Sequence, residues 1–175
     1  MMIMETEIMI RSIIIMSRSM LRLKFLVVFV LFLMLFSGCR QNVLLDDNLA
    51  VDAKGWDYRN RAGFELVVDD TMALHAFYLN VRQKETYRYS NLYVFLHTSF
   101  PNGTITHDTI ECVLARPDGK WLGKSSGNYI SNQILLNESL RFPLSGRYRF
   151  EIEQAMREEK LQGITDIGIR IETLK

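Results

Sequence analysis

Few side chains in this sequence could carry out chemistry, and they form no known catalytic pattern. The chain has three histidines, His75, His97 and His107. His97 and His107 flank a turn at Pro101, so pairing of the flanking segments would bring the two imidazoles together, with Asp108 nearby. A metal site needs three or four ligands at a characteristic spacing, and this trio has no such motif. We therefore predict no metal site.

Glu151 and Glu153 are the next candidates, because a pair of carboxylates can hydrolyse a glycosidic bond. Their spacing puts them on one face of a strand, about 7 Å apart, as on any solvated sheet face. Cys112 alternates with Ile110 and Leu114, which is typical of a small buried side chain. The chain lacks the serine-hydrolase, phosphate-loop and zinc-protease motifs. The sequence thus predicts no catalytic residue and no cofactor, and we expect that the protein is not an enzyme.

Cys39 has a clearer chemical role. It ends the run Phe36-Ser37-Gly38-Cys39, which looks like a bacterial lipobox. At such a site the cysteine thiol accepts a diacylglycerol, a peptidase cuts before the cysteine, and the new amino group can be acylated. Cysteine is required because its thiol is the nucleophile. We predict that Cys39 is the site of lipid attachment.

The residues before Cys39 resemble a secretory signal. Arg18, Arg22 and Lys24 precede an apolar run over 25–36, and small residues follow it. A membrane-spanning helix needs about 20 apolar residues, so this run is too short to be one. We predict that residues 1–38 are a signal peptide and that translation begins at Met20 or Met16, because the shortest complete signal begins at Met20.

Lipidation would anchor the protein to a membrane, since each buried methylene contributes about 0.8 kcal/mol. Arg40 follows the cysteine in place of an aspartate that would favour inner-membrane retention, and no acidic tract typical of surface display follows. We therefore expect a lipid-anchored protein at the periplasmic face of the outer membrane. Residues 39–55 are polar with little periodicity and are interpreted as a lipidated tether, after which Trp56 is the first residue to dock.

The composition excludes several classes of protein. Hydrophobic residues make up 48% and charged residues 23% of the 175 residues, a balance typical of globular proteins. The formal net charge is +1 and no basic stripe is visible, so a nucleic-acid partner is not expected.

Period-two alternation of apolar residues dominates residues 56–175 and indicates short strands. The turn sequences Pro101-Asn102-Gly103 and Pro117-Asp118-Gly119 separate several of them. We predict a single all-β domain over 56–175, an antiparallel β-sandwich of about seven to eight strands. Its predicted core residues alternate along the strands: Phe64, Leu66, Phe77, Val94, Leu96, Ile110, Tyr148, Phe150, Ile152, Ile167 and Ile169.

A loop over 120–129 is the best candidate for a binding surface. It is rich in glycine, including Gly123, and carries an aromatic residue near each end, Trp121 and Tyr129. Rigid aromatic anchors beside small residues are typical of binding loops. The alternative for Trp121 is a side chain that folds back onto the core. Arg157 lies in a charged bend and is a second candidate for partner binding, with a structural ion pair as its alternative.

The chain beyond Cys39 resembles the gliding-motility lipoprotein GldH family of the Bacteroidetes. The segments that carry the resemblance occur in the same order over about 70 residues: Phe100-Pro-Asn-Gly-Thr, Asp108-Thr-Ile-Glu, Pro117-Asp-Gly-Lys-Trp-Leu-Gly123, Phe142-Pro-Leu-Ser-Gly-Arg-Tyr148, Glu153-Gln-Ala-Met-Arg157 and Gly163-Ile-Thr-Asp-Ile-Gly-Ile-Arg-Ile-Glu172.

This resemblance implies a non-catalytic lipoprotein associated with the outer membrane and linked to the gliding-motility and type IX secretion machinery. Its partners would be the membrane, through the lipid on Cys39, and other envelope proteins. The resemblance supplies no catalytic residues. The alternative is a glycan-binding β-sandwich lipoprotein that presents Tyr87, Tyr89 and Tyr93 as a flat aromatic surface.

Lipidation of Cys39 can be tested directly. Intact-mass analysis of the protein purified from membranes should show a chain that begins at Cys39 and carries acyl mass. Cys39→Ala removes the nucleophile, so we expect an uncleaved or soluble form without acyl mass. An unmodified cysteine in the wild-type protein would contradict the prediction.

Overall fold

The computed structural model describes residues 43–174, and this part of the chain consists of β-strands joined by turns and loops. It is all-β, as predicted, with eleven strands of which eight have seven or more residues. Among the described residues, no helix is long and apolar enough to cross a membrane. Residues 1–42 and Lys175 lie outside this part, so the signal peptide, the start codon and Cys39 lipidation stay predictions.

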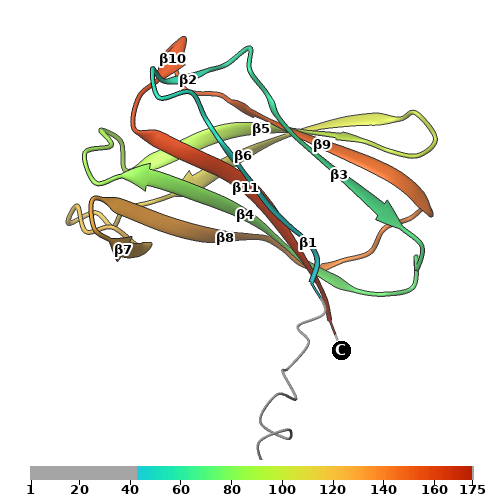
Figure 1. The fold of residues 1–175 in the computed structure, drawn as a ribbon. Helices are drawn as coiled ribbons and strands as arrows, with labels where there is room; N and C mark the ends of the chain where they lie inside the picture. Colours follow the sequence, from blue (N-terminus) through green and yellow to red (C-terminus); the bar gives the residue numbers. More distant parts are fainter. Residues whose placement is uncertain (1–42, 175) are drawn as a thin grey trace, which may run out of the picture. The chain divides into compact units, whose positions relative to one another are not determined.

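The strands form two large sheets and one small one, and every pair is antiparallel. The five-stranded sheet has the order β1 (Val43–Ala50), β11 (Ile164–Thr173), β4 (His75–Lys84), β8 (Tyr129–Leu140), β7 (Lys124–Ser126). The four-stranded sheet has the order β3 (Ala62–Val68), β9 (Gly146–Gln154), β5 (Asn91–Ser99), β6 (Ile105–Val113). The small sheet pairs β2 (Trp56–Asp57) with β10 (Lys160–Leu161) near one end of the molecule (Figure 1).

A single layer of apolar side chains fills the space between the two large sheets. Alternate residues of β4, β5, β9 and β11 point into it, and Val94, Tyr148 and Ile169 are completely buried. Ten of the eleven predicted core residues are buried, and Ile110 is half-buried against the same cluster. The period-two prediction of the inner faces is therefore confirmed.

Both predicted turns form. At the first, the Phe100 amide donates to the Thr104 carbonyl at 2.8 Å, and Gly103 takes φ = 83°, which side chains other than glycine's rarely adopt. This turn joins β5 to β6. At the second, Arg116 donates to the Lys120 carbonyl at 2.9 Å, and the turn brings Trp121 back beside Ala115.

The tether prediction is wrong for residues 43–50, which form β1 at the edge of the five-stranded sheet. Only Val43 and Leu45 are half-buried, and the other six residues are exposed. Main-chain pairing with β11 holds this strand, so its sequence needs no apolar alternation. Trp56 docks as expected: it is buried, and its indole N–H donates to the Asn60 carbonyl at 2.9 Å.

Removal of a core aromatic side chain should show how much the apolar layer contributes to the free energy of unfolding. Phe150 is 2% exposed and contacts the ring of Phe77 at a centroid distance of 5.4 Å, so Phe150→Ala should lower the free energy of unfolding by about 3–5 kcal/mol. Val113→Ala, at a 55% exposed position, is the control and should change it by less than about 0.5 kcal/mol. Chemical denaturation measures both, and a loss below about 1 kcal/mol for Phe150→Ala would contradict this description of the core.

Candidate functional site

Trp121 is not an exposed anchor. Its side chain is half-buried and packs against the core, and its backbone pairs with Ala115. The next amide, that of Leu122, donates to the Leu114 carbonyl at 2.9 Å. The alternative interpretation, a tryptophan that folds back onto the core, is therefore the one that the structure supports.

The rest of the predicted binding loop is largely a hairpin. β7 pairs with the start of β8 through the two-residue turn Gly127-Asn128, where Gly127 has φ = 59°. Gly123 is required by close packing, because an added Cβ would lie 2.6 Å from the Ser131 carbonyl oxygen. Tyr129 is 36% exposed, and the Arg82 guanidinium lies over its ring, 4.7 Å from the ring centroid. Of the three candidate residues in this loop, Trp121, Gly123 and Tyr129, only Tyr129 therefore keeps the exposed position that was expected.

Arg157 is exposed, and the described residues give it no ion pair, so its structural alternative does not apply. The Gln154 side chain fixes the bend that carries it: Nε2 donates to the Glu158 carbonyl at 2.6 Å and Oε1 accepts from the Met156 amide at 2.9 Å. Arg157 lines a shallow depression of about 320 Å³ together with Tyr58, Phe95 and Met156.

These side chains form part of an aromatic patch on the outer face of the four-stranded sheet, defined here as Tyr58, Tyr93, Phe95, Met156 and Arg157. The three aromatic residues are 41%, 37% and 38% exposed. The Met156 thioether accepts a hydrogen bond from the Tyr93 amide at 3.3 Å, which joins the bend to β5. Aromatic residues, methionine and arginine are the types enriched in protein interfaces.

The Tyr58 end of the patch is held by charge. The Arg59 guanidinium lies 5.4 Å from the Tyr58 ring centroid, and its Nε and Nη2 donate to the two carboxylate oxygens of Asp57 at 2.9 and 2.8 Å. These hydrogen bonds hold the pKa of Asp57 at about 2, below its usual value. Tyr58 is thus held in place at this end of the patch by Arg59, which is itself fixed by Asp57.

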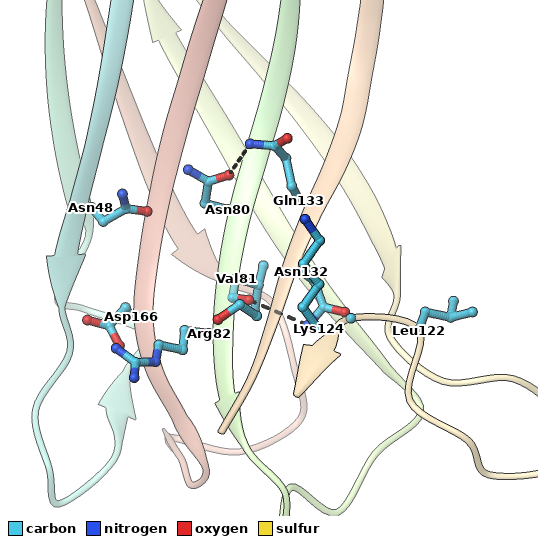
Figure 2. Close-up of a pocket in the computed structure, with 11 residues that line it drawn as sticks. Asn48, Asn80, Val81, Arg82, Leu122, Lys124, Asn132, Gln133 and Asp166 are labelled. Atoms are coloured by element: carbon cyan, nitrogen blue, oxygen red, sulfur yellow. Dashed lines mark hydrogen bonds between the residues drawn. The ribbon is translucent and has the colours of Figure 1, made fainter. Parts of the chain in front are cut away.

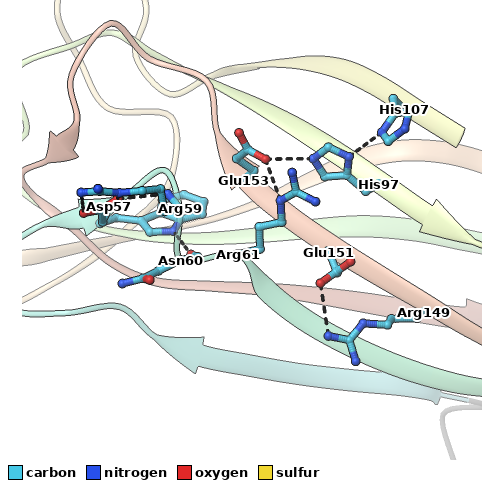
Figure 3. Close-up of polar contacts among 10 residues, drawn as sticks. Asp57, Arg59, Asn60, Arg61, His97, His107, Arg149, Glu151 and Glu153 are labelled. Carbon is cyan, nitrogen blue, oxygen red and sulfur yellow. Dashed lines mark hydrogen bonds and ion pairs between the residues drawn. The ribbon is translucent and has the colours of Figure 1, made fainter. Parts of the chain in front are cut away.

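A row of polar side chains crosses the same face (Figure 3). Glu153 accepts from Arg61 Nε at 2.7 Å, and the same carboxylate oxygen lies 3.1 Å from His97 Nε2. His97 and His107 face each other in register, with their Nδ1 atoms 2.5 Å apart, as the hairpin predicted. One imidazole donates and the other accepts at this contact, so the row links β9, β5 and β6 to Arg61, the residue just before β3.

The other candidate residues from the sequence, Asp108 and Glu151, do not join this row of polar side chains. Asp108 pairs with Leu96 and lines a cleft between the two large sheets, on the opposite side of β6 from His107. Glu151 accepts a hydrogen bond from Arg149 Nη2 at 3.2 Å, so its partner differs from that of Glu153. Within residues 43–174, no three potential metal ligands gather in one place.

Two further predictions concern Cys112 and the tyrosines. Cys112 is completely buried, and burial raises the pKa of its thiol to about 12, as suits a small core side chain. The flat tyrosine surface of the glycan-binding alternative does not form. Tyr87 is buried and meets Tyr89 edge to face at 68°, while Tyr93 lies on the aromatic patch.

A second depression, of about 660 Å³, lies on the outer face of the five-stranded sheet (Figure 2). Most of its lining residues are polar, and they include Asn48, Asn80 and Gln133 from three different strands. Sequence reasoning missed these residues, because isolated amides on separate strands give no local signal until the register of the sheet is known.

A profile of the family described as GldH lipoprotein matches residues 43–171. The chain belongs to this family. It is 33% identical over 152 residues to a gliding motility lipoprotein GldH homolog of Christiangramia forsetii, which covers 83% of this chain and 93% of the relative. It is 31% identical over 147 residues to the gliding motility lipoprotein GldH of Flavobacterium johnsoniae, covering 80% and 90%.

The GldH resemblance is thereby confirmed, and the family links the chain to gliding motility. These GldH relatives are named as lipoproteins and not as enzymes. Among solved structures, an α-L-arabinofuranosidase shares 10% identity with the chain over 73% of this chain and 19% of its own, with a TM-score of 0.36. A similarity this weak carries no argument about function.

Trp121 and Arg157 can be separated by their effects on stability. Trp121→Ala removes apolar surface that packs on the core, so we expect the free energy of unfolding to fall by about 2 kcal/mol. Arg157→Ala removes an exposed side chain and should change it by less than about 0.5 kcal/mol. Thermal and urea unfolding of both variants test this, and an unchanged Trp121→Ala would restore the exposed-anchor interpretation.

Proposed function

We propose that this protein is a non-catalytic lipoprotein of the outer membrane, anchored through Cys39, that serves the gliding-motility and type IX secretion machinery by binding other envelope proteins. Membership of the GldH family supports the link to gliding motility. The observation that carries the mode of action is the aromatic patch, because protein interfaces depend on residue types such as its exposed aromatic residues and Arg157, which has no ion pair among residues 43–174.

The position of β1 supports a domain held close to the membrane. With the lipid on Cys39, three residues precede Val43, and the chain from Cys39 to Val43 can span at most about 14 Å. β1 begins where β11 ends and β4 begins, since Val43 pairs with Glu172 and His75 with Thr173. A tether this short favours contacts with partners that lie at the membrane surface.

The aromatic patch lies toward the far end of the domain. β4 runs away from the start of β1, and β5 begins after the connection that follows β4. Tyr93 and Phe95 belong to the first half of β5, so they lie nearer this end than the anchored one. This position leaves the patch accessible to another protein on the same side of the membrane.

Substitution in the patch should remove partner binding without loss of the fold. We expect Phe95→Ala combined with Arg157→Ala to reduce the recovery of specific envelope proteins at least tenfold when the lipidated protein is cross-linked in cells and purified. Spreading of a gliding host and export of type IX cargo should fall in parallel. Val67→Ala, 52% exposed on the same sheet face but outside the patch, is the control and should behave as wild type.

Two results would contradict the proposal. One is a set of cross-linked partners that the double substitution leaves unchanged although the protein is folded and lipidated. The other is normal cargo export and spreading in cells that lack the protein altogether.

A further inference from the structure

Three amide side chains form a row across the outer face of the five-stranded sheet. Asn48 on β1 is paired with Gly168 on β11, Gly168 with Asn80 on β4, and Asn80 with Gln133 on β8. Residues directly opposite in a sheet point to the same side. Figure 2 shows Asn48, Asn80 and Gln133 along one line, and Gln133 Nε2 donates to Asn80 Oδ1 at 3.3 Å.

Gly168 allows this amide row to be continuous. A Cβ at Gly168 would collide with Asn48 Oδ1 and with the Asp47 carbonyl oxygen. Without it, the Asn48 amide lies over the backbone of β11. The row thus crosses four adjacent strands, and neighbouring strands are about 4.8 Å apart.

A second row, parallel to the first, carries charge. Asp166 on β11 is paired with Arg82 on β4, Arg82 with Ser131 on β8, and Ser131 with Lys124 on β7. Arg82 stacks on Tyr129, and neither Arg82 nor Lys124 has an ion pair within the described residues. Two cations and one carboxylate give this row a positive balance.

The two rows line the depression of about 660 Å³, a size typical of small-molecule sites. Eight of its eleven lining residues are polar or charged, and Leu122 is the one exposed apolar side chain among them, so a polar ligand is favoured over a hydrophobic one. Each amide offers two donor hydrogens and an acceptor oxygen. Gln133 Nε2 donates to Asn80 Oδ1 and Asn80 Nδ2 donates to Asp46 Oδ1 at 3.5 Å, and these two hydrogen bonds use only part of that capacity. The floor therefore presents donors and acceptors side by side to a ligand.

From this arrangement we infer that the depression binds an acidic oligosaccharide, one that carries carboxylate groups on its sugar rings. The ring hydroxyls, which both donate and accept, match the amide row, and Asp166 accepts from a further hydroxyl. The carboxylate of the sugar pairs with Arg82 and Lys124, because a charge-assisted hydrogen bond is stronger than a neutral one. The site is on the opposite face of the sandwich from the aromatic patch, so it is independent of the proposed protein contacts.

Titration calorimetry on the full chain, purified from membranes in detergent, tests this inference with three probes. They are a galacturonic acid hexamer, a galactose hexamer as the neutral match, and an oligo-aspartate peptide as a polyanion without hydroxyls. We expect saturable binding of the galacturonic acid hexamer at submillimolar concentration, and binding at least tenfold weaker for the other two probes.

Four single substitutions assign the binding to the depression. Arg82→Gln removes the charge, and either Asn80→Ala or Gln133→Ala interrupts the amide row. Each substitution should weaken the binding of the galacturonic acid hexamer at least tenfold. Gln133 is exposed, so its variant keeps the test open if Asn80→Ala does not fold. Arg141→Gln, an exposed arginine outside the depression, is the matched control and should bind as wild type.

The inference is overturned by any of three outcomes. No saturable binding of the galacturonic acid hexamer at 10 mM would exclude a carbohydrate site of this kind. Equal binding of the galactose hexamer would show that the cations take no part. Equal binding of oligo-aspartate, unaffected by Asn80→Ala and Gln133→Ala, would show that the depression attracts anions without recognising sugars.

Discussion

Burial of one apolar layer between two sheets is the constraint on which the rest of this structure depends. The inner residues of β4, β5, β9 and β11 fill that layer, and Leu79, Ile152 and Ile167 have almost no contact with solvent. A shift of any strand by one residue would move its apolar side chains to the outer face. Burial of the inner face therefore sets the register, and the register in turn decides which polar residues stand beside one another outside.

The two outer faces differ because their residues are free of this constraint. On the four-stranded sheet, exposed aromatic residues lie beside the row from Arg61 to His107. On the five-stranded sheet, amides and charged groups line a depression instead. Each arrangement requires residues from three or four strands in register. A GldH lipoprotein with one aromatic and one polar face could contact two kinds of partner at once.

The edge strand β1 is held to the fold by strand pairing more than by burial. Asp46 of β1 pairs with Arg170 of β11, and the main chains of the two strands pair from Val43 to Ala50. These contacts place the first described residue next to the end of β11. A strand that buries little apolar surface is therefore held in register by its pairing with β11.

Local sequence patterns were sufficient to predict the features that depend on neighbouring residues in the chain. Alternation along a strand has the same period as the strand itself, so the sandwich and ten of the eleven predicted core residues could be predicted from the sequence. Turn residues such as Gly103 were recognisable because their backbone angles restrict the choice of residue. The ordered segments over about 70 residues were likewise enough to identify the family.

Other features depended on which strands become neighbours, and no local pattern encodes that. β1 was mistaken for a tether because pairing with β11, and not burial, holds it in place. The sequence left Trp121 open between an exposed anchor and a side chain folded back onto the core, because the turn that returns it to Ala115 is defined only in three dimensions. The amide row of Asn48, Asn80 and Gln133 spans residues 48–133 of the sequence, and only the pairing of four strands in register brings it together.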